Sequence, residues 1–135
     1  MKNDINEISV LYEFIEQVGS DLNLDASLIM SLNLALEEAV SNIIMYAFPK
    51  EDHQNIKLDV NKKGSDLVFT LTDSGVAFDP TIKDDPDLDL SAEDRPIGGL
   101  GIFLIKQIMN EVTYSRMDDN NVFIMKKHID NNIKD

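Results

Sequence analysis

The 135-residue sequence contains no cysteine and no tryptophan, and it has only six glycines and four prolines. The absence of cysteine excludes disulfide frameworks and thiolate metal sites. No run of about 18 apolar residues is present, so no transmembrane helix is predicted. The first ten residues, MKNDINEISV, lack the apolar segment of a signal peptide. We therefore expect a cytoplasmic location.

Basic residues are also scarce, with 12 Lys and Arg against 25 Asp and Glu and a formal net charge of −13. Nucleic acids and anionic membrane surfaces both bind clustered basic side chains, so neither partner is expected. A nucleotide remains compatible with this charge, because a metal ion can neutralise its phosphates within a local site. The length suits one domain, and we expect a single domain over residues 1–135.

The apolar pattern predicts an α+β fold. Helical spacing is found in residues 5–18, 25–48 and 102–109, alternating spacing in 56–60 and 67–71, and two further strands are expected at 111–116 and 122–128 around a turn at 118–121. Asp25 is a suitable N-cap after a break at 19–24. We expect a two-layer sandwich, with a mixed, mostly antiparallel sheet and three helices on one face.

Two segments carry no apolar period. The first, about 79–97, is dense in Asp and Pro, and a loop of this length in a compact domain is usually functional or disordered. We interpret it as a lid over a binding site. The second is the polar tail at 129–135, which is expected to be frayed.

Glu38 and Asn42 are one turn apart on the second predicted helix, so their side chains share a face. Taken alone, this pair is most simply a solvated edge, because charged residues on helices usually face water. Asn42 nevertheless lies beside the apolar stripe. An amide oxygen suits a hard cation such as Mg²⁺, and a carboxylate one turn away suits a general base.

Two glycine-containing motifs follow in the chain. Asp73 and Gly75 stand at the end of a predicted strand, where they form either a plain turn or a site in which a carboxylate meets a base amino group. Gly98, Gly99 and Gly101 open a helix, and glycines there leave backbone N–H groups free to hold phosphate. Four of the six glycines lie in these two motifs, which favours a ligand site over scattered turns.

Several other sites are excluded by pattern. The chain lacks the P-loop motif, and Gly99-Leu-Gly101 is not followed by the third glycine of a Rossmann fingerprint. An EF-hand counted from Asp85 would place Leu90 and Pro96 where glycine and glutamate are required. His53 and His128 have no partner at metal-ligand spacing and are predicted to lie on the surface.

The order of these motifs resembles that of the Bergerat-fold ATPases, the superfamily of gyrase, Hsp90, MutL and the sensor histidine kinases. Glu38-Ala-Val-Ser-Asn42 is similar to their N box, Asp73-Ser-Gly75 to the G1 box, the long loop to the lid, and Gly98-Gly-Leu-Gly101 to the G2 box. The resemblance spans roughly residues 11–125. The small, stand-alone anti-sigma-factor serine/threonine kinases are the most similar branch, because no histidine precedes His53 as a sensor kinase would require.

This resemblance implies a role for each motif residue. Glu38 would be the general base and Asn42 would hold Mg²⁺ beside ATP. Asp73 would bind the adenine amino group, with Gly75 against the ring. The G2 segment would bracket the phosphates, through Gly98, Gly99, Leu100 and Gly101, and Arg95, the only cation late in the lid, is a candidate contact to them.

The resemblance also implies the function. By this resemblance the chain would be an ATP-dependent serine/threonine protein kinase that acts as an anti-sigma factor. Its substrate would be a serine of a STAS-type anti-anti-sigma protein, and a sigma factor would be a second candidate partner. Members of the branch are commonly homodimers. The alternatives are an ATP-binding regulatory module that switches partner binding without phosphoryl transfer, and a hydrolase-type ATPase. The presence of Glu38 favours the kinase, because a pure binder does not need a base.

The sequence departs from the family pattern at several positions. Ala77 replaces a second glycine, which is expected to narrow the base pocket, and Tyr46 stands where some members have histidine. Asn120-Asn121 replaces a Gly-Thr pair, so an adenine-side contact is expected to be lost. The first predicted helix starts almost at Met1, so the edge strand that relatives place before it is expected either to be missing or to lie upstream of this start.

Overall fold

The computed structural model describes residues 8–44, 56–82 and 99–129. Its elements are α1 (Ile8–Asp21), α2 (Ala26–Asn42), β1 (Ile56–Lys63), β2 (Asp66–Asp73), the short 3-10 helix η3 (Pro80–Ile82), α3 (Gly99–Ile108), β3 (Glu111–Met117) and β4 (Asn120–His128). The predicted order of helices and strands is confirmed, with η3 in addition. None of the described helices is long and apolar enough to span a membrane.

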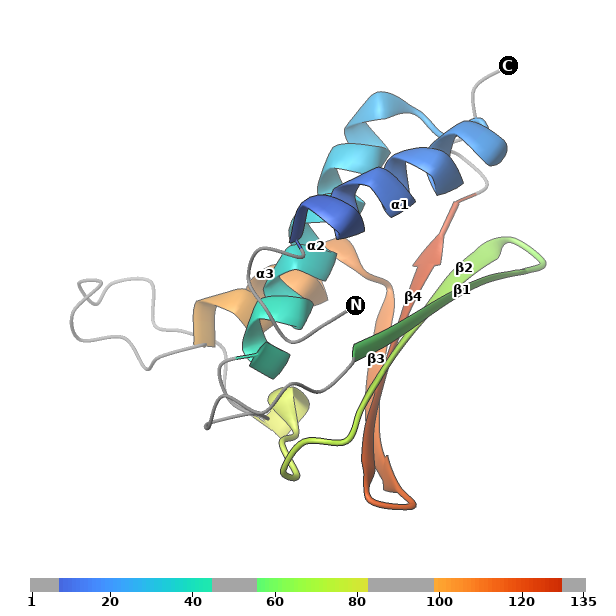
Figure 1. The fold of residues 1–135 in the computed structure, drawn as a ribbon. Coiled ribbons are helices and arrows are strands. Elements are labelled where there is room, and N and C mark those ends of the chain that lie inside the picture. The colour runs from blue at the N-terminus through green and yellow to red at the C-terminus, as the bar shows by residue number, and fades with distance from the viewer. Residues whose placement is uncertain (1–7, 45–55, 83–98, 130–135) are drawn as a thin grey trace, which may run out of the picture.

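The four described strands form one sheet in the order β1-β2-β4-β3, and every neighbouring pair is antiparallel. The three α-helices cover one face of this sheet (Figure 1), which confirms the predicted α+β sandwich. The parallel part of the expected mixed sheet is not found among these strands. The reason is that the connection through α3 takes the chain from β2 to the far edge, and β4 then lies between β2 and β3.

The core lies between the helices and the inner face of the sheet. The predicted inward stripe of α2 is buried, at Leu28, Leu32, Ala35, Leu36, Ala39 and Ile43. It meets alternate residues of the two central strands, among them Phe69 and Met125, which are opposite one another in the β2–β4 register. Burial of this apolar surface is the main force that holds the two layers together.

The start of α2 is as predicted, whereas the end of α1 is not. Asp25 is the N-cap, and its carboxylate accepts a hydrogen bond from the Ser27 amide at 3.0 Å. Gly19 was expected to break α1 but is buried within it. A Cβ at Gly19 would lie 2.4 Å from Cδ1 of Ile29, so the glycine permits the close approach of α1 to α2.

The two hairpins have turns of two residues. Gly64, between β1 and β2, has a φ of +60°, and Asp118 and Asp119, between β3 and β4, have φ values of 51° and 64°. Such left-handed turns match the twist of paired strands. The second turn is shorter than predicted, so Asn121, which was placed in it, belongs to β4 and is paired with Asp73 of β2.

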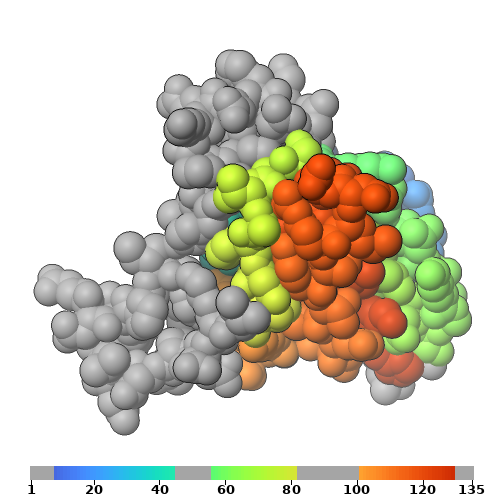
Figure 2. Space-filling view, turned by 90° about the horizontal axis from the view of Figure 1, so that it is seen from below, coloured from blue at the N-terminus to red at the C-terminus, as the bar shows by residue number. Residues whose placement is uncertain are grey.

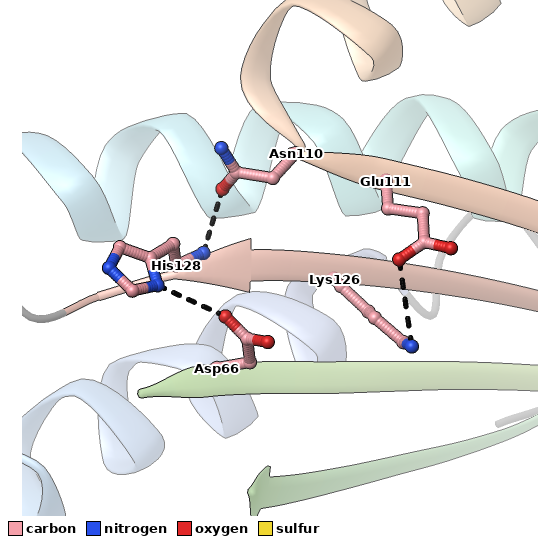
Figure 3. A network of polar contacts seen from close by, with 5 residues as sticks. All are labelled: Asp66, Asn110, Glu111, Lys126 and His128. Carbon is pink, nitrogen blue, oxygen red and sulfur yellow. Dashed lines mark hydrogen bonds and ion pairs between the residues drawn. The ribbon is translucent and has the colours of Figure 1, made fainter. Parts of the chain in front are cut away.

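A polar network lies at the end of the sheet where Asp66 of β2 is paired with His128 of β4 (Figure 3). The backbone N–H of His128 donates to Oδ1 of Asn110 at 2.7 Å, and its ring Nδ1 lies 3.2 Å from Oδ1 of Asp66. His128 is exposed, as predicted, while His53 lies outside the described residues. Ile129 follows directly and was assigned to the frayed tail, but it is buried and its amide donates to the Ser65 carbonyl at 2.9 Å.

Candidate functional site

Three polar side chains are buried in the described part of the chain, namely Asn42, Asp73 and Asn121. All three line one pocket. The rest of its lining is mostly apolar and comes from α2, α3, the β3–β4 hairpin and the segment after β2, with Ala39, Ile43, Phe78, Pro80, Ile105, Tyr114 and Phe123. Buried polar groups are costly unless they are satisfied, so their collection in one concave place marks a binding site.

The two motif residues of α2 lie at its C-terminal end. Asn42 is buried in the pocket, and Glu38, one turn earlier, is half-buried. Their placement follows from the helical period, because both flank the inward stripe that packs on the sheet. No described residue forms a hydrogen bond with the Asn42 side chain. Asn42 is only 7% exposed, so the solvated-edge interpretation of this residue is wrong.

The start of α3 approaches these two residues. A Cβ at Gly101 would lie 2.9 Å from Oε2 of Glu38 and 3.4 Å from Nδ2 of Asn42. Any side chain at Gly101 would therefore enter the space in front of both groups. The N box and the G2 box, 63 positions apart between Glu38 and Gly101, form one wall of the site, and the glycine keeps it open.

Glu38 has an unusual electrostatic environment. Burial raises the pKa of its carboxyl group above the ordinary value of 4.5, and the negative charge of the neighbouring Glu37 raises it further. Both causes favour the protonated form. Glu37 itself accepts a hydrogen bond from the hydroxyl of Tyr12 on α1. A carboxylate whose proton affinity is increased in this way is suited to general-base chemistry.

Asp73 lines the pocket at the end of β2, and Gly75 follows two residues later. The Gly75 amide donates to Oδ1 of Asp73 at 2.9 Å, which closes a tight turn after the strand. Both residues are buried. Ala77, which was expected to narrow the pocket, is instead exposed and does not line it.

The structure adds Asn121, Tyr114 and Arg116 to the predicted residues. The Asn121 side chain donates to Oδ1 of Asp73 at 3.0 Å, and the Tyr114 hydroxyl donates to Oδ1 of Asn121 at 2.5 Å. Arg116 donates to the Gly75 carbonyl at 2.7 Å. Asn121 therefore lines the pocket, while the expected loss of an adenine-side contact at this position stays a prediction. The only signal in the sequence was the resemblance itself, which aligned this position with a family motif.

The remaining predicted residues are only partly described. Gly99 and Leu100 are the first residues of α3, so the G2 segment does open a helix. Arg95 and Gly98 lie outside the described residues, as does most of the predicted lid. Of that lid the structure describes residues 79–82, where Pro80 lines the pocket.

The donor set fits a metal ion that arrives with a nucleotide. Among the described residues no group of three or more His, Cys, Asp and Glu side chains could hold a metal. Mg²⁺ is commonly bound by one or two protein oxygens together with phosphates and water. Asn42, beside the space that Gly101 keeps clear, is in place to supply one such oxygen.

Comparison with known proteins identifies the family. Residues 1–127 match the family described as histidine kinase-like ATPase domain. The chain is 30% identical to the serine/threonine-protein kinase BtrW of Bordetella bronchiseptica, over 94% of both chains. It is also 30% identical to the serine-protein kinase RsbW of Listeria monocytogenes serotype 4a, over 75% of this chain and 66% of the relative.

Solved structures agree in fold. The catalytic domain of the histidine kinase ThkA superposes with a TM-score of 0.54 at 16% identity, over 95% of both chains. The histidine kinase domain of a blue-light activated kinase from Erythrobacter litoralis EL346 gives a TM-score of 0.56 at 12% identity, over 92% of this chain and 60% of the other. Together, the family match and these relatives show that the chain belongs to the histidine kinase-like ATPase domain family, in the branch of the serine/threonine-protein kinases.

Proposed function

We propose that the chain binds ATP with Mg²⁺ and transfers the γ-phosphoryl group to a serine or threonine of a partner protein. One observation carries the proposal: the three buried polar side chains of the described residues line one pocket, and Glu38 stands at its edge beside Gly101. A binding pocket alone would explain Asp73. It would not explain why Glu38, whose carboxyl pKa is raised, lies next to Gly101 at the start of α3.

Different residues of the chain bind the adenine and the phosphates. At the adenine end of the site, Asp73 accepts a hydrogen bond from the adenine amino group, and Gly75 allows the flat ring to lie close to the backbone. At the phosphate end Asn42 supplies an oxygen to Mg²⁺, which when bound offsets the charge on the phosphates. Glu38 takes the proton from the attacking hydroxyl.

The partner is proposed from the family branch. Relatives named serine-protein kinase and serine/threonine-protein kinase support a protein hydroxyl as the acceptor. We propose that this acceptor is a serine of a STAS-type anti-anti-sigma protein and that the chain acts as an anti-sigma factor, as a homodimer that binds a sigma factor. The net charge of −13 speaks against nucleic acid as the partner.

Substitution of Glu38 by glutamine tests the proposal. Glu38→Gln should bind ATP as tightly as the parent chain, because the adenine contacts are unchanged. Phosphate transfer to a STAS-domain protein should fall by roughly 10²–10⁴-fold, the usual contribution of a general base. Labelled phosphate on the partner measures transfer, and calorimetry measures binding.

Glu37→Gln is the matched control, since it makes the same chemical change one residue away and should retain transfer at neutral pH. Transfer that is unaffected by Glu38→Gln would contradict the base assignment. If the parent chain binds ATP but phosphorylates no partner, and nucleotide still changes partner affinity, the regulatory module is the correct function.

A further inference from the structure

Asn121 has an unusual number of hydrogen bonds for one buried amide. Its Nδ2 donates to Oδ1 of Asp73 at 3.0 Å and to the Val76 carbonyl at 2.8 Å. Its Oδ1 accepts from the Phe78 amide at 3.2 Å, the Tyr114 hydroxyl at 2.5 Å and Nη1 of Arg116 at 3.2 Å. The residue is 3% exposed. The side chain therefore joins β2, the segment after it, and β3.

The partners of Asn121 fix the orientation of its amide. An arginine side chain and a backbone N–H can only donate, so the oxygen must face Arg116 and Phe78. A carboxylate and a carbonyl can only accept, so the nitrogen must face Asp73 and Val76. Rotation of the amide by 180° would place donor against donor and acceptor against acceptor. Both hydrogens of the Asn121 amide group are consequently committed.

This arrangement determines which oxygen of Asp73 can meet a ligand. Oδ1 already accepts from the Gly75 amide at 2.9 Å and from Asn121 at 3.0 Å. Within the described part of the chain, no group hydrogen-bonds to Oδ2. Asp73 lines the pocket, so Oδ2 is the acceptor that remains for a donor on the ligand.

The same amide fixes the segment that follows β2. Val76 and Phe78 are bound to Asn121 through their backbones, and Arg116 holds the Gly75 carbonyl at 2.7 Å. Figure 2 shows this segment lying along the β3–β4 hairpin. Phe78 lines the pocket, so the Asn121 contacts also set the position of one of its apolar walls.

We propose that Asn121 is a positioning residue that aims Asp73 Oδ2 at the amino group of the base and holds the segment 74–78 in its binding conformation. The inference rests on the proposed nucleotide site. It replaces the idea of a lost adenine contact with a contact made through Asp73. An amide is required, because this position must donate to a carboxylate and accept from an arginine at once.

The charges around Asp73 allow the requirement for an amide at position 121 to be tested by the pH dependence of nucleotide binding. From β3 the pocket receives Tyr114, and Arg116 contacts Asn121. From α2 it receives the neutral Asn42, with the carboxyl group of Glu38 at its edge beside Gly101. From α3 it receives the apolar Ile105, and from the segment after β2 Phe78 and Pro80. Asp79, next to Pro80, directs its carboxylate to the amide and hydroxyl of Thr81. A new carboxylate at position 121 would therefore meet Asp73 directly.

The test is Asn121→Asp, with binding of a non-hydrolysable ATP analogue measured from pH 5 to pH 8. Two carboxylates about 3 Å apart are not both ionised without cost, so one takes up a proton. At pH 8 we expect affinity to fall by about 10–100-fold, the loss that accompanies a broken buried hydrogen bond to a charged group. At pH 5 a shared proton restores a donor between them, and much of the affinity should return relative to the parent chain at the same pH.

Asn120→Asp is the matched control, because it adds the same charge one residue earlier, where the side chain donates a hydrogen bond to the Asp118 carbonyl and none to Asp73. It should bind the analogue as the parent chain does at every pH. Parental affinity of Asn121→Asp at pH 8 would overturn the proposal. A loss of equal size at pH 5 and pH 8 would also overturn it, since a purely structural defect has no reason to recover on acidification.

Asn121→Ala provides a readout without nucleotide. Removal of the acceptor should speed hydrogen exchange at the Phe78 amide, and unchanged exchange there would contradict the positioning role even if the aspartate variant does not fold. If the parent chain fails to bind ATP, the proposed function is wrong, and the exchange experiment still decides whether Asn121 orders the segment. The two failures are therefore distinguishable.

Discussion

At the scale of single residues, the protonation of Glu38 is controlled by its burial and by one neighbouring charge. Burial raises the pKa of its carboxyl group, and the charge of Glu37 adds to the effect. The general base that we propose at Glu38 must be ionised to accept a proton, so activity should fall as the pH drops through this raised pKa. The acidic limb of the pH–rate profile should therefore lie above 4.5, the ordinary value for glutamate.

Glu37→Gln tests the contribution of the neighbouring charge. The substitution removes the charge repulsion but leaves the burial, so the acidic limb should move to lower pH without reaching the ordinary value. Transfer rates measured between pH 4.5 and pH 8 give the position of the limb. Tyr12→Phe is the control, because it removes the hydrogen bond to Glu37 while the charge stays. An identical limb in the parent chain and Glu37→Gln would refute the coupling.

At the scale of elements, the contact between α2 and the start of α3 should separate activity from stability. In Gly101→Ala the new methyl group would lie 2.9 Å from Oε2 of Glu38, the free end of a flexible side chain that can move away at little cost. Alanine also favours a helix over glycine by about 1 kcal/mol. We expect an unfolding midpoint that is equal or higher, with transfer reduced at least about tenfold because the base is displaced.

Urea unfolding and the transfer assay measure the two effects on the same preparation. A variant that loses stability and activity together would show that Gly101 matters for packing alone. The double variant Gly101→Ala with Glu38→Gln shows whether the two substitutions act on the same step. If the methyl group acts through Glu38, it should add little to the loss of transfer already caused by Glu38→Gln.

The elements also show which parts of the fold are predictable. Asp25 was identified as a cap because capping depends on residues a few positions apart, and the α2 stripe because its period is local. Gly19 was misassigned as a break, because a glycine is needed there only for packing against another helix. A Cβ at this position would lie 2.4 Å from Ile29 of α2. The β3–β4 turn was made too long because asparagine is typical of turns, and only the pairing with the neighbouring strands shows that Asn120 and Asn121 belong to β4.

At the scale of the molecule, the site depends on strand register. Asp73 is paired with Asn121, 48 positions later, because β4 is inserted between β2 and β3. Hydrophobic alternation predicts that these strands exist and which face is inward, but it does not say which residue stands opposite which. Glu38, Asn42 and Asp73 could be proposed from motifs. Asn121, Tyr114 and Arg116 became visible only with the sheet.

The net charge of −13 makes a further prediction for the whole molecule. Acidic groups repel each other more strongly in the folded chain than in the expanded one, so salt that shortens the screening length should stabilise the fold. Between about 0.01 and 0.3 M NaCl we expect a gain of roughly 1 kcal/mol, or a midpoint higher by about 3–6 °C for a chain of this size.

The variant Glu13→Gln with Glu16→Gln tests the cause of this salt effect. The two residues are exposed on α1, three positions apart, and their substitution changes the formal charge from −13 to −11. Thermal unfolding should show the variant to be more stable than the parent chain at low salt, with a difference that shrinks as salt is added. A difference that persists at high salt would point to helix propensity instead of charge. A midpoint of the parent chain that does not respond to salt would show that its acidic groups are too far apart to destabilise the fold.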